Sequence, residues 1–170
     1  MSTAYQLSKD GHDVTVFEKD PLFGESSFAR SCGGFRAQYF TPTNVEMSRY
    51  SIDFVKNNTD VDFIENGYLM LFGLNQKADH DYSYKMQREL GASTIKLTNR
   101  QLEISHSYLN TSDIYSGCIT TDGSEGWLDP VSLHKWYRDN TDCLFIYADG
   151  TKVNHDSADA VVITAGCWSY

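Results

Sequence analysis

One acidic residue, Glu18, follows directly on a short apolar run near the start of the chain. The residues up to it, STAYQLSKDGHDVTVFEK, predict a helix with one apolar side, a turn at Asp10-Gly11 and a buried strand. In a dinucleotide-binding βαβ unit, an acid about 20 residues past the first glycine holds the ribose hydroxyls. The spacing therefore predicts a ribose-binding role for Glu18. We expect the preceding strand and its G-x-G-x-x-G turn to lie outside these 170 residues.

A second chemically suggestive segment is the run ESSFARSCGG at residues 25–34. Its serines and glycines let hydroxyl and backbone N–H groups approach a phosphate or a flat ring closely, and Arg30 can neutralise negative charge. The alternative interpretation is a flexible surface loop, which the run by itself favours.

The remaining pattern mixes helices and strands. It predicts helices at 43–57, capped by Thr43, at 76–90, from Thr98 and after Pro130, and strands at 67–72, 114–121 and 158–165. The last strand contains the run Ala160 to Ile163. An almost continuous apolar strand of this kind is typical of the middle of a parallel sheet that is covered on both faces.

Composition and charge narrow the class of partner. The chain is 41% hydrophobic, which is enough to build a core, and its net charge is −9. Nucleic acid and anionic membrane surfaces would repel such a chain, so we expect a small-molecule ligand. No leader or membrane-spanning run is visible, which predicts a soluble, cytoplasmic protein.

The cysteines and histidines do not indicate a metal site. The four cysteines show no C-x-x-C pair, so buried free thiols are the favoured interpretation; they are Cys32, Cys118, Cys143 and Cys167. The five histidines are scattered without metal-ligand spacing, and we interpret them as surface or hydrogen-bonded structural residues.

Five blocks in order give a more specific indication. They are STAYQLSKDGHDVTVFEK, SSFARSCGGFRAQY, ENGYLMLF, GWLDPVSL and ADAVVITAGCWS, and together they span almost the whole chain. The combination resembles the FAD-dependent oxidoreductase family that contains sarcosine oxidases, glycine oxidases and D-amino-acid oxidases. The resemblance implies a mixed α/β fold. Part of a Rossmann-like, FAD-binding domain of the glutathione-reductase type (residues 1–60 and 130–170) would join part of an antiparallel substrate domain (residues 61–129).

The same resemblance implies a set of FAD-binding residues. Glu18 would bind the adenosine ribose and Lys19 would lie beside the adenine. The serines and the arginine of the second segment would follow the pyrophosphate and ribityl chain; they are Ser26, Ser27, Arg30 and Ser31. Gly33 and Gly34 would let the backbone pass close to the flavin ring, and Ala165 and Gly166 would end the last core strand against the cofactor.

The implied reaction is oxidation of a C–N bond next to a carboxylate, in a small amino acid or secondary amine, with hydride transfer to the flavin. The resemblance names no catalytic residue, and it leaves Arg36 between a flavin-facing and a solvent-facing position. A different class stays open: a non-catalytic remnant or truncated gene product that does not hold FAD by itself, or that pairs with a partner chain carrying the missing elements. A hydrolase is disfavoured, because Ser26, Ser124 and Ser132 lack the G-x-S-x-G context of a nucleophile elbow.

Overall fold

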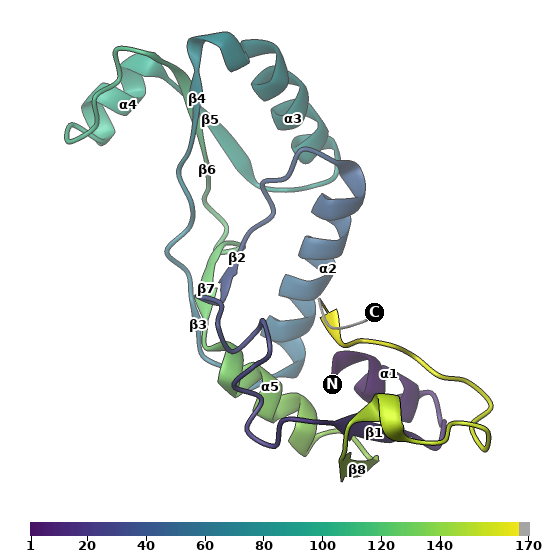
Figure 1. The fold of residues 1–170 in the computed structure, drawn as a ribbon. Coiled ribbons are helices and arrows are strands. Elements are labelled where there is room, and N and C mark those ends of the chain that lie inside the picture. Colours follow the sequence, from purple (N-terminus) through teal and green to yellow (C-terminus); the bar gives the residue numbers. More distant parts are fainter. Residues whose placement is uncertain (167–170) are drawn as a thin grey trace. The chain divides into compact units, whose positions relative to one another are not determined.

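The computed structural model describes residues 1–166. The chain divides into two compact units, which are described separately (Figure 1). The first unit consists of Met1–Ser31 and Pro130–Tyr170, and the second unit of Cys32–Asp129. Residues 32–60, which the resemblance places with the FAD-binding domain, therefore fold with the second unit. No helix of the described residues is long and apolar enough to cross a membrane.

The first unit is built on two parallel strands. β1 (Thr15–Glu18) pairs with β8 (Leu144–Tyr147), with Glu18 opposite Tyr147 at the carboxyl end. Helix α1 (Ser2–Lys9) packs against α5 (Pro130–Asp139), where the Tyr5 ring lies 5.3 Å from that of Trp136. A 3₁₀ turn, η2 (Gly150–Lys152), follows β8. The predicted first helix, first strand and post-Pro130 helix are thus confirmed.

The predicted strand at 158–165 is wrong. Residues 158–165 belong to no strand, and the apolar side chains of Val161, Val162 and Ile163 are 54%, 58% and 71% exposed. A strand requires neighbouring N–H and C=O groups to pair with, and the parallel sheet of the described residues consists of β1 and β8 alone. Apolar character therefore did not suffice to form a strand here.

The second unit contains two antiparallel sheets of three strands each. One sheet has the order β2 (Gly34–Phe35), β7 (Gly126–Leu128), β3 (Phe63–Ile64). The other has the order β4 (Met70–Gly73), β6 (Ile114–Thr120), β5 (Thr94–Thr98). The predicted strand at 67–72 starts later than expected, at Met70, and β6 matches its prediction.

Three helices complete the second unit: α2 (Pro42–Asn58), α3 (Lys77–Glu89) and α4 (Asn99–Ser105), with the 3₁₀ turn η1 (Leu74–Gln76) before α3. The cap of α2 is Thr41, not the predicted Thr43, because Pro42 occupies the first turn of the helix. Thr98 caps α4 as predicted: Gln101 donates its N–H to the Thr98 hydroxyl, and the Gln101 side chain accepts the Thr98 N–H at 2.8 Å.

The core of the second unit lies between α2, α3 and the segment after β2. Ala37 and Val45 are fully buried, and Met86 and Ala92 are nearly so. The half-buried Tyr39 and Leu90 pack against this cluster. Figure 1 shows α2 and α3 on the same side of the strands of this unit. Residues 36–39 are therefore part of a packed interior even though they form no regular element.

Candidate functional site

Glu18 lies at the carboxyl end of the parallel strand pair. Its side chain is half-buried, and one carboxylate oxygen accepts the N–H of Asp20 at 2.8 Å. Ligands of open parallel sheets bind outside the carboxyl ends of the strands, so this edge is the place where a nucleotide ribose would meet an acid. The predicted place of Glu18 at the end of a strand is confirmed, and its ribose-binding role stays a prediction.

The loop after Glu18 consists of successive turns that use its polar side chains internally. The hydroxyls of Ser26 and Ser31 donate to the carbonyl oxygens of Phe23 and Phe28. Arg30 donates from Nε to the carbonyl of Gly24 at 3.1 Å, and its guanidinium pairs with Glu25 at 2.9 Å. Lys19 and Ser27 are exposed. The structure therefore brings these residues onto one loop, with the Ser26 and Ser31 protons already engaged in its turns.

Aromatic rings anchor that loop to the rest of the first unit. The buried Phe23, whose φ of 56° is unusual for a side-chain-bearing residue, lies 4.3 Å from the ring of His134 on α5. Phe28 stacks on the same imidazole at 4.5 Å, and Phe23 also contacts Phe145 of β8. Burial, with a contribution from Arg138, lowers the pKa of His134 to about 4. His134 is consequently a neutral packing residue, as the sequence suggested.

Gly33 and Gly34 lie in the second unit, where the backbone conformation of the first and the nearby Tyr68 side chain at the second favour glycine. Gly33 has a φ of +64°, and its carbonyl accepts the N–H of Leu128 at 3.1 Å. A Cβ at Gly34 would lie 2.2 Å from the hydroxyl oxygen of Tyr68. Both residues are thus explained by β2 and its neighbours, and the close approach of a flat ring is a further use that the resemblance alone implies.

Arg36 follows directly on β2 and is a candidate that the sequence left open. Its guanidinium lies over the ring of Tyr39, 4.9 Å from the centroid, and Nη1 lies 4.0 Å from the sulfur of Met70. Its Nε is buried and has no hydrogen-bond partner among the described residues. Buried N–H donors normally have an acceptor, and this one has none among the described residues. Arg36 as a whole is half-buried, so part of the residue remains accessible.

Ala165 and Gly166, at the end of the described chain, are not arranged as predicted. Both are exposed and lie outside any strand, and a Cβ at Gly166 would meet no atom within 4 Å. The strand that should have ended against the cofactor is absent from this region of the described chain, so these two positions have no structural support for a binding role.

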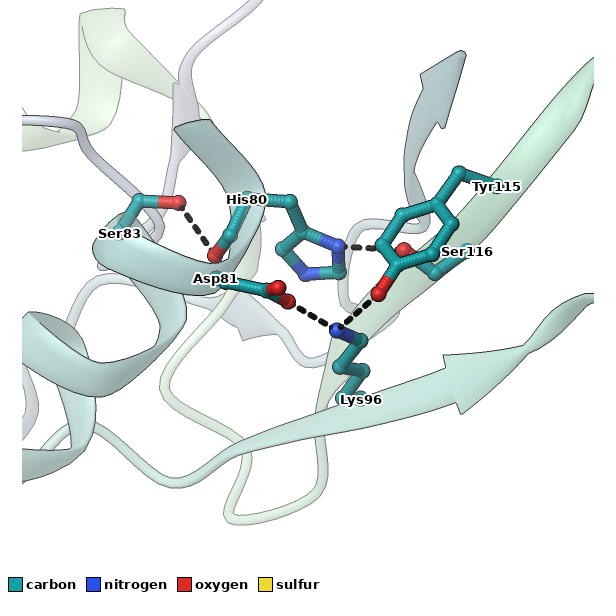
Figure 2. A network of polar contacts seen from close by, with 6 residues as sticks. All are labelled: His80, Asp81, Ser83, Lys96, Tyr115 and Ser116. Carbon is teal, nitrogen blue, oxygen red and sulfur yellow. Dashed lines mark hydrogen bonds and ion pairs between the residues drawn. The ribbon is translucent and has the colours of Figure 1, made fainter. Parts of the chain in front are cut away.

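A buried polar network in the second unit escaped the sequence analysis (Figure 2). His80 of α3, only 1% exposed, has Nδ1 2.5 Å from the hydroxyl of Ser116 on β6, and its ring stacks on Phe72 at 3.8 Å. Its Nε2 has no partner among the described residues, so the expectation of a hydrogen-bonded structural histidine holds for one nitrogen only. Burial, with Lys96 nearby, lowers its pKa to about 4.

This network is structural and not a nucleophilic pair. Ser116 is also 1% exposed, so its hydroxyl cannot contact the reacting bond of a substrate. At the edge of the network, Lys96 of β5 pairs with Asp81 and donates to the hydroxyl of Tyr115 at 3.2 Å. The nearby cleft lined by Phe40, Met70 and Phe72 has no room for a water molecule.

The described thiols differ from the expectation of uniform burial. All three are free; Cys118 is buried, Cys143 is half-buried and Cys32 is exposed, and Cys167 lies outside the described residues. Burial raises the pKa of Cys118 to about 11, which makes it an inert packing residue. Across residues 1–166, no three histidine, cysteine or acidic side chains gather closely enough to hold a metal ion.

Comparisons with known proteins give consistent results. A family model described as "FAD dependent oxidoreductase" matches residues 1–170. The FAD-dependent oxidoreductase domain-containing protein 1 homolog of Drosophila melanogaster is 33% identical over 147 residues, which cover 81% of this chain and 28% of the relative. The Xenopus laevis protein of that name is 29% identical, covering 89% of this chain and 33% of its own length. The chain therefore spans about a third of the length of these relatives.

Solved structures agree at the level of the fold. The L-proline dehydrogenase of P. horikoshii superposes with a TM-score of 0.71 at 23% identity, covering 85% of this chain and 40% of that structure. The glycine oxidase of Geobacillus kaustophilus gives a TM-score of 0.67 at 18% identity, covering 91% of this chain and 45% of that structure. The mixed α/β arrangement is thus that of part of such a flavoenzyme.

Proposed function

Because the chain belongs to the family of FAD-dependent oxidoreductases, we propose that it takes part in oxidising a C–N bond of a small amino acid or secondary amine. Sarcosine, glycine and D-amino acids are the substrates we would test first. Proteins of this family bind FAD, and a structure similar to this chain, that of an L-α-glycerophosphate oxidase, contains it. The observation that carries the proposal is the acid of Glu18 at the carboxyl end of β1, in a chain that matches the family model throughout.

The first unit is proposed to hold the adenosine end of the cofactor. Glu18 would accept the ribose hydroxyls, and Lys19 is exposed beside it. Along the pyrophosphate we propose Arg30 and the backbone N–H groups around Ser27, since the protons of the Ser26 and Ser31 hydroxyls are used within the loop. The ion pair of Arg30 with Glu25 is exposed and therefore weak, so Arg30 can exchange partners at small cost.

The second unit is proposed to face the flavin and the substrate. Gly33 and Gly34 would allow the flavin ring to approach the backbone. Arg36, three residues after Gly33, would bind the substrate carboxylate, which is supported by its half-buried position and by the lack of an ion pair with another described residue. Bound FAD would supply the oxidation by accepting a hydride from the carbon, so this chain's own residues have only to bind, orient and balance charge.

The test measures the affinity of the chain for FAD. The readout is either flavin fluorescence or the visible absorbance that is retained after free FAD is removed. Glu18→Ala removes charge-assisted hydrogen bonds, and we expect roughly tenfold to hundredfold weaker binding. The control is Glu46→Ala, because Glu46 is exposed on α2 and has no hydrogen bond or ion pair with another described residue. Equal affinity of the Glu18 variant and the unchanged chain would overturn the assignment.

The same measurement distinguishes the alternative. A folded chain that retains no flavin at all would favour a non-catalytic remnant, or a chain that needs a partner to complete its site. In that event, sedimentation of the chain with candidate partner polypeptides would be the next experiment. Retained flavin would justify the substrate screen.

A further inference from the structure

A second buried acid, Glu125, forms an unusual set of hydrogen bonds in the second unit. It lies between the turn at Asp122 and strand β7, and its side chain is fully buried. One carboxylate oxygen accepts two successive backbone N–H groups, those of Ala37 at 2.9 Å and Gln38 at 3.0 Å. The other oxygen accepts Nε2 of the Gln38 side chain at 2.8 Å. The carboxylate thus takes the place of an anion bound by backbone N–H groups.

The segment that Glu125 binds has little other backbone support. Residues 36–39 lie between β2 and α2 and form no regular element, so their N–H groups have no sheet partner. The N–H of Tyr39 bonds locally to the carbonyl of Ala37 at 3.0 Å. From the opposite side, Gln87 of α3 donates to the carbonyl of Tyr39 at 2.8 Å. The side chains of Glu125, just before β7, and of Gln87 on α3 therefore hold this segment where a sheet does not.

Arg36 is covalently attached to the first of the two N–H groups that Glu125 accepts. The carboxylate is used by N–H groups and not by the guanidinium, and Arg36 forms no ion pair with another described residue. The direction of the Arg36 side chain consequently depends on the peptide between Arg36 and Ala37, which Glu125 fixes. Because the Glu125 carboxylate bonds to the Ala37 and Gln38 N–H groups and to the Gln38 side chain, it does not neutralise the Arg36 guanidinium through an ion pair.

We propose that Glu125 is a positioning residue that fixes residues 36–38 and thereby holds the Arg36 guanidinium in place for an anionic ligand group. This inference rests on the proposed function, in which that group is the substrate carboxylate. The requirement for glutamate follows from its partners: all three are donors, and a carboxylate offers only acceptors. Glutamine at this position would direct an NH₂ group at one or more of those donors.

The experiment measures Arg36 itself, in the ¹⁵N-labelled chain of 170 residues. The Nε–H resonance of Arg36 is assigned by its loss in Arg36→Lys. Its heteronuclear NOE reports the order of the side chain. Its chemical shift on titration with sodium acetate reports anion binding, and sodium chloride is the reference salt. Glu125→Gln is compared with the unchanged chain. Glu46→Gln is the matched control, since it removes the same charge from an exposed position on α2.

We expect Glu46→Gln to behave as the unchanged chain, and Glu125→Gln to lose the ordered Arg36 signal and bind acetate at least about tenfold more weakly. An ordered Arg36 with unchanged acetate affinity in a folded Glu125→Gln chain would overturn the inference. Absence of acetate binding in the unchanged chain would overturn the carboxylate role of Arg36 in the proposed function, and the NOE comparison would still decide the role of Glu125.

A second measurement on the unchanged chain covers the event that Glu125→Gln does not fold. If Glu125 holds the segment, the amides of Ala37 and Gln38 exchange with solvent at least about tenfold more slowly than exposed loop amides such as that of Ser27. Exchange of the Ala37 and Gln38 amides at the rate of exposed amides would overturn the inference.

Discussion

The two units of the chain are stabilised in different ways. In the second unit, side-chain hydrogen bonds are buried at the centre: Glu125, His80, Ser83 and Ser116 are each at most 1% exposed. In the first unit, among the described residues, only Ala4 and Phe23 are buried apolar side chains, and the contacts of the Phe23 and Phe28 rings with His134 hold the loop that follows β1. The second unit therefore has a core of its own, whereas the first unit is stabilised mainly by aromatic contacts around His134.

This difference bears on where binding residues can be placed. Segments with few buried contacts open at low free-energy cost, which suits a loop that must close around a ligand. The proposed pyrophosphate-binding residues, Ser27 and Arg30, lie on such a loop, whereas Arg36 lies on a segment held by buried acceptors and donors. We expect the first unit to adapt to its ligand and the second unit to present a fixed surface.

The largest expected effect tests the contrast in core packing. Leu102 of α4 is fully buried and packs against Gly117 of β6, so Leu102→Ala should destabilise the second unit by about 2–5 kcal/mol. The matched change in the first unit, Val162→Ala, removes a side chain that is 58% exposed and should alter stability by no more than about 0.5 kcal/mol. Urea unfolding measures both, and similar losses would show that the contrast is wrong.

The next prediction concerns pH. The pKa of His80 is about 4 in the folded chain and ordinarily 6.5, because burial, with Lys96 adding to it and Asp81 opposing it, disfavours the charged ring. The unfolded chain thus binds the proton first, so His80 contributes its full stability above about pH 6.5 and loses it as the pH falls to about 4. The loss is on the order of 3 kcal/mol.

Unfolding at several pH values between 7 and 4 checks this prediction, with His80→Gln as the variant. Glutamine does not titrate and can still bond to Ser116, so the slope of stability with pH should flatten for the second unit. His134→Gln should flatten the slope for the first unit, because the rings of Phe23 and Phe28 that contact His134 belong to that unit. Amide exchange measures the two units separately, and a His134 variant that left the first unit's slope unchanged would contradict this prediction.

Much of this arrangement follows from local sequence signals. The apolar pattern on either side of Asp10-Gly11 predicted α1 and β1, and Thr98 was predicted as the start of the helix that is α4, because each signal depends on residues close together in the chain. The position of Glu18 at the end of a strand was likewise predicted from the local pattern. These features need no knowledge of distant contacts.

Other features depend on contacts between distant residues. β2 and β3 have two residues each, too few for any periodicity, and they form because β7 lies between them. Glu125 bonds to the backbone of Ala37 and Gln38, which lie 88 and 87 positions earlier in the chain. A glutamate gives no sign in the sequence that it will be buried. The run at 158–165 had the composition of a buried strand, yet the described chain provides no neighbour for it to pair with.

The smallest expected effect compares two glycines. A Cβ at Gly126 of β7 would lie 1.8 Å from the carbonyl oxygen of Ile64, so Gly126→Ala must displace the backbone of β3 and should cost about 1–3 kcal/mol. A Cβ at Gly150 would meet only Cβ of Phe17, at an ordinary 3.8 Å, so Gly150→Ala should change stability by no more than about 0.5 kcal/mol. Thermal unfolding of both variants measures the two costs. A loss of stability in Gly150→Ala as large as that in Gly126→Ala would mean that the first unit is packed as tightly as the second. The proposal that its cofactor-binding loop is adaptable would then have no basis.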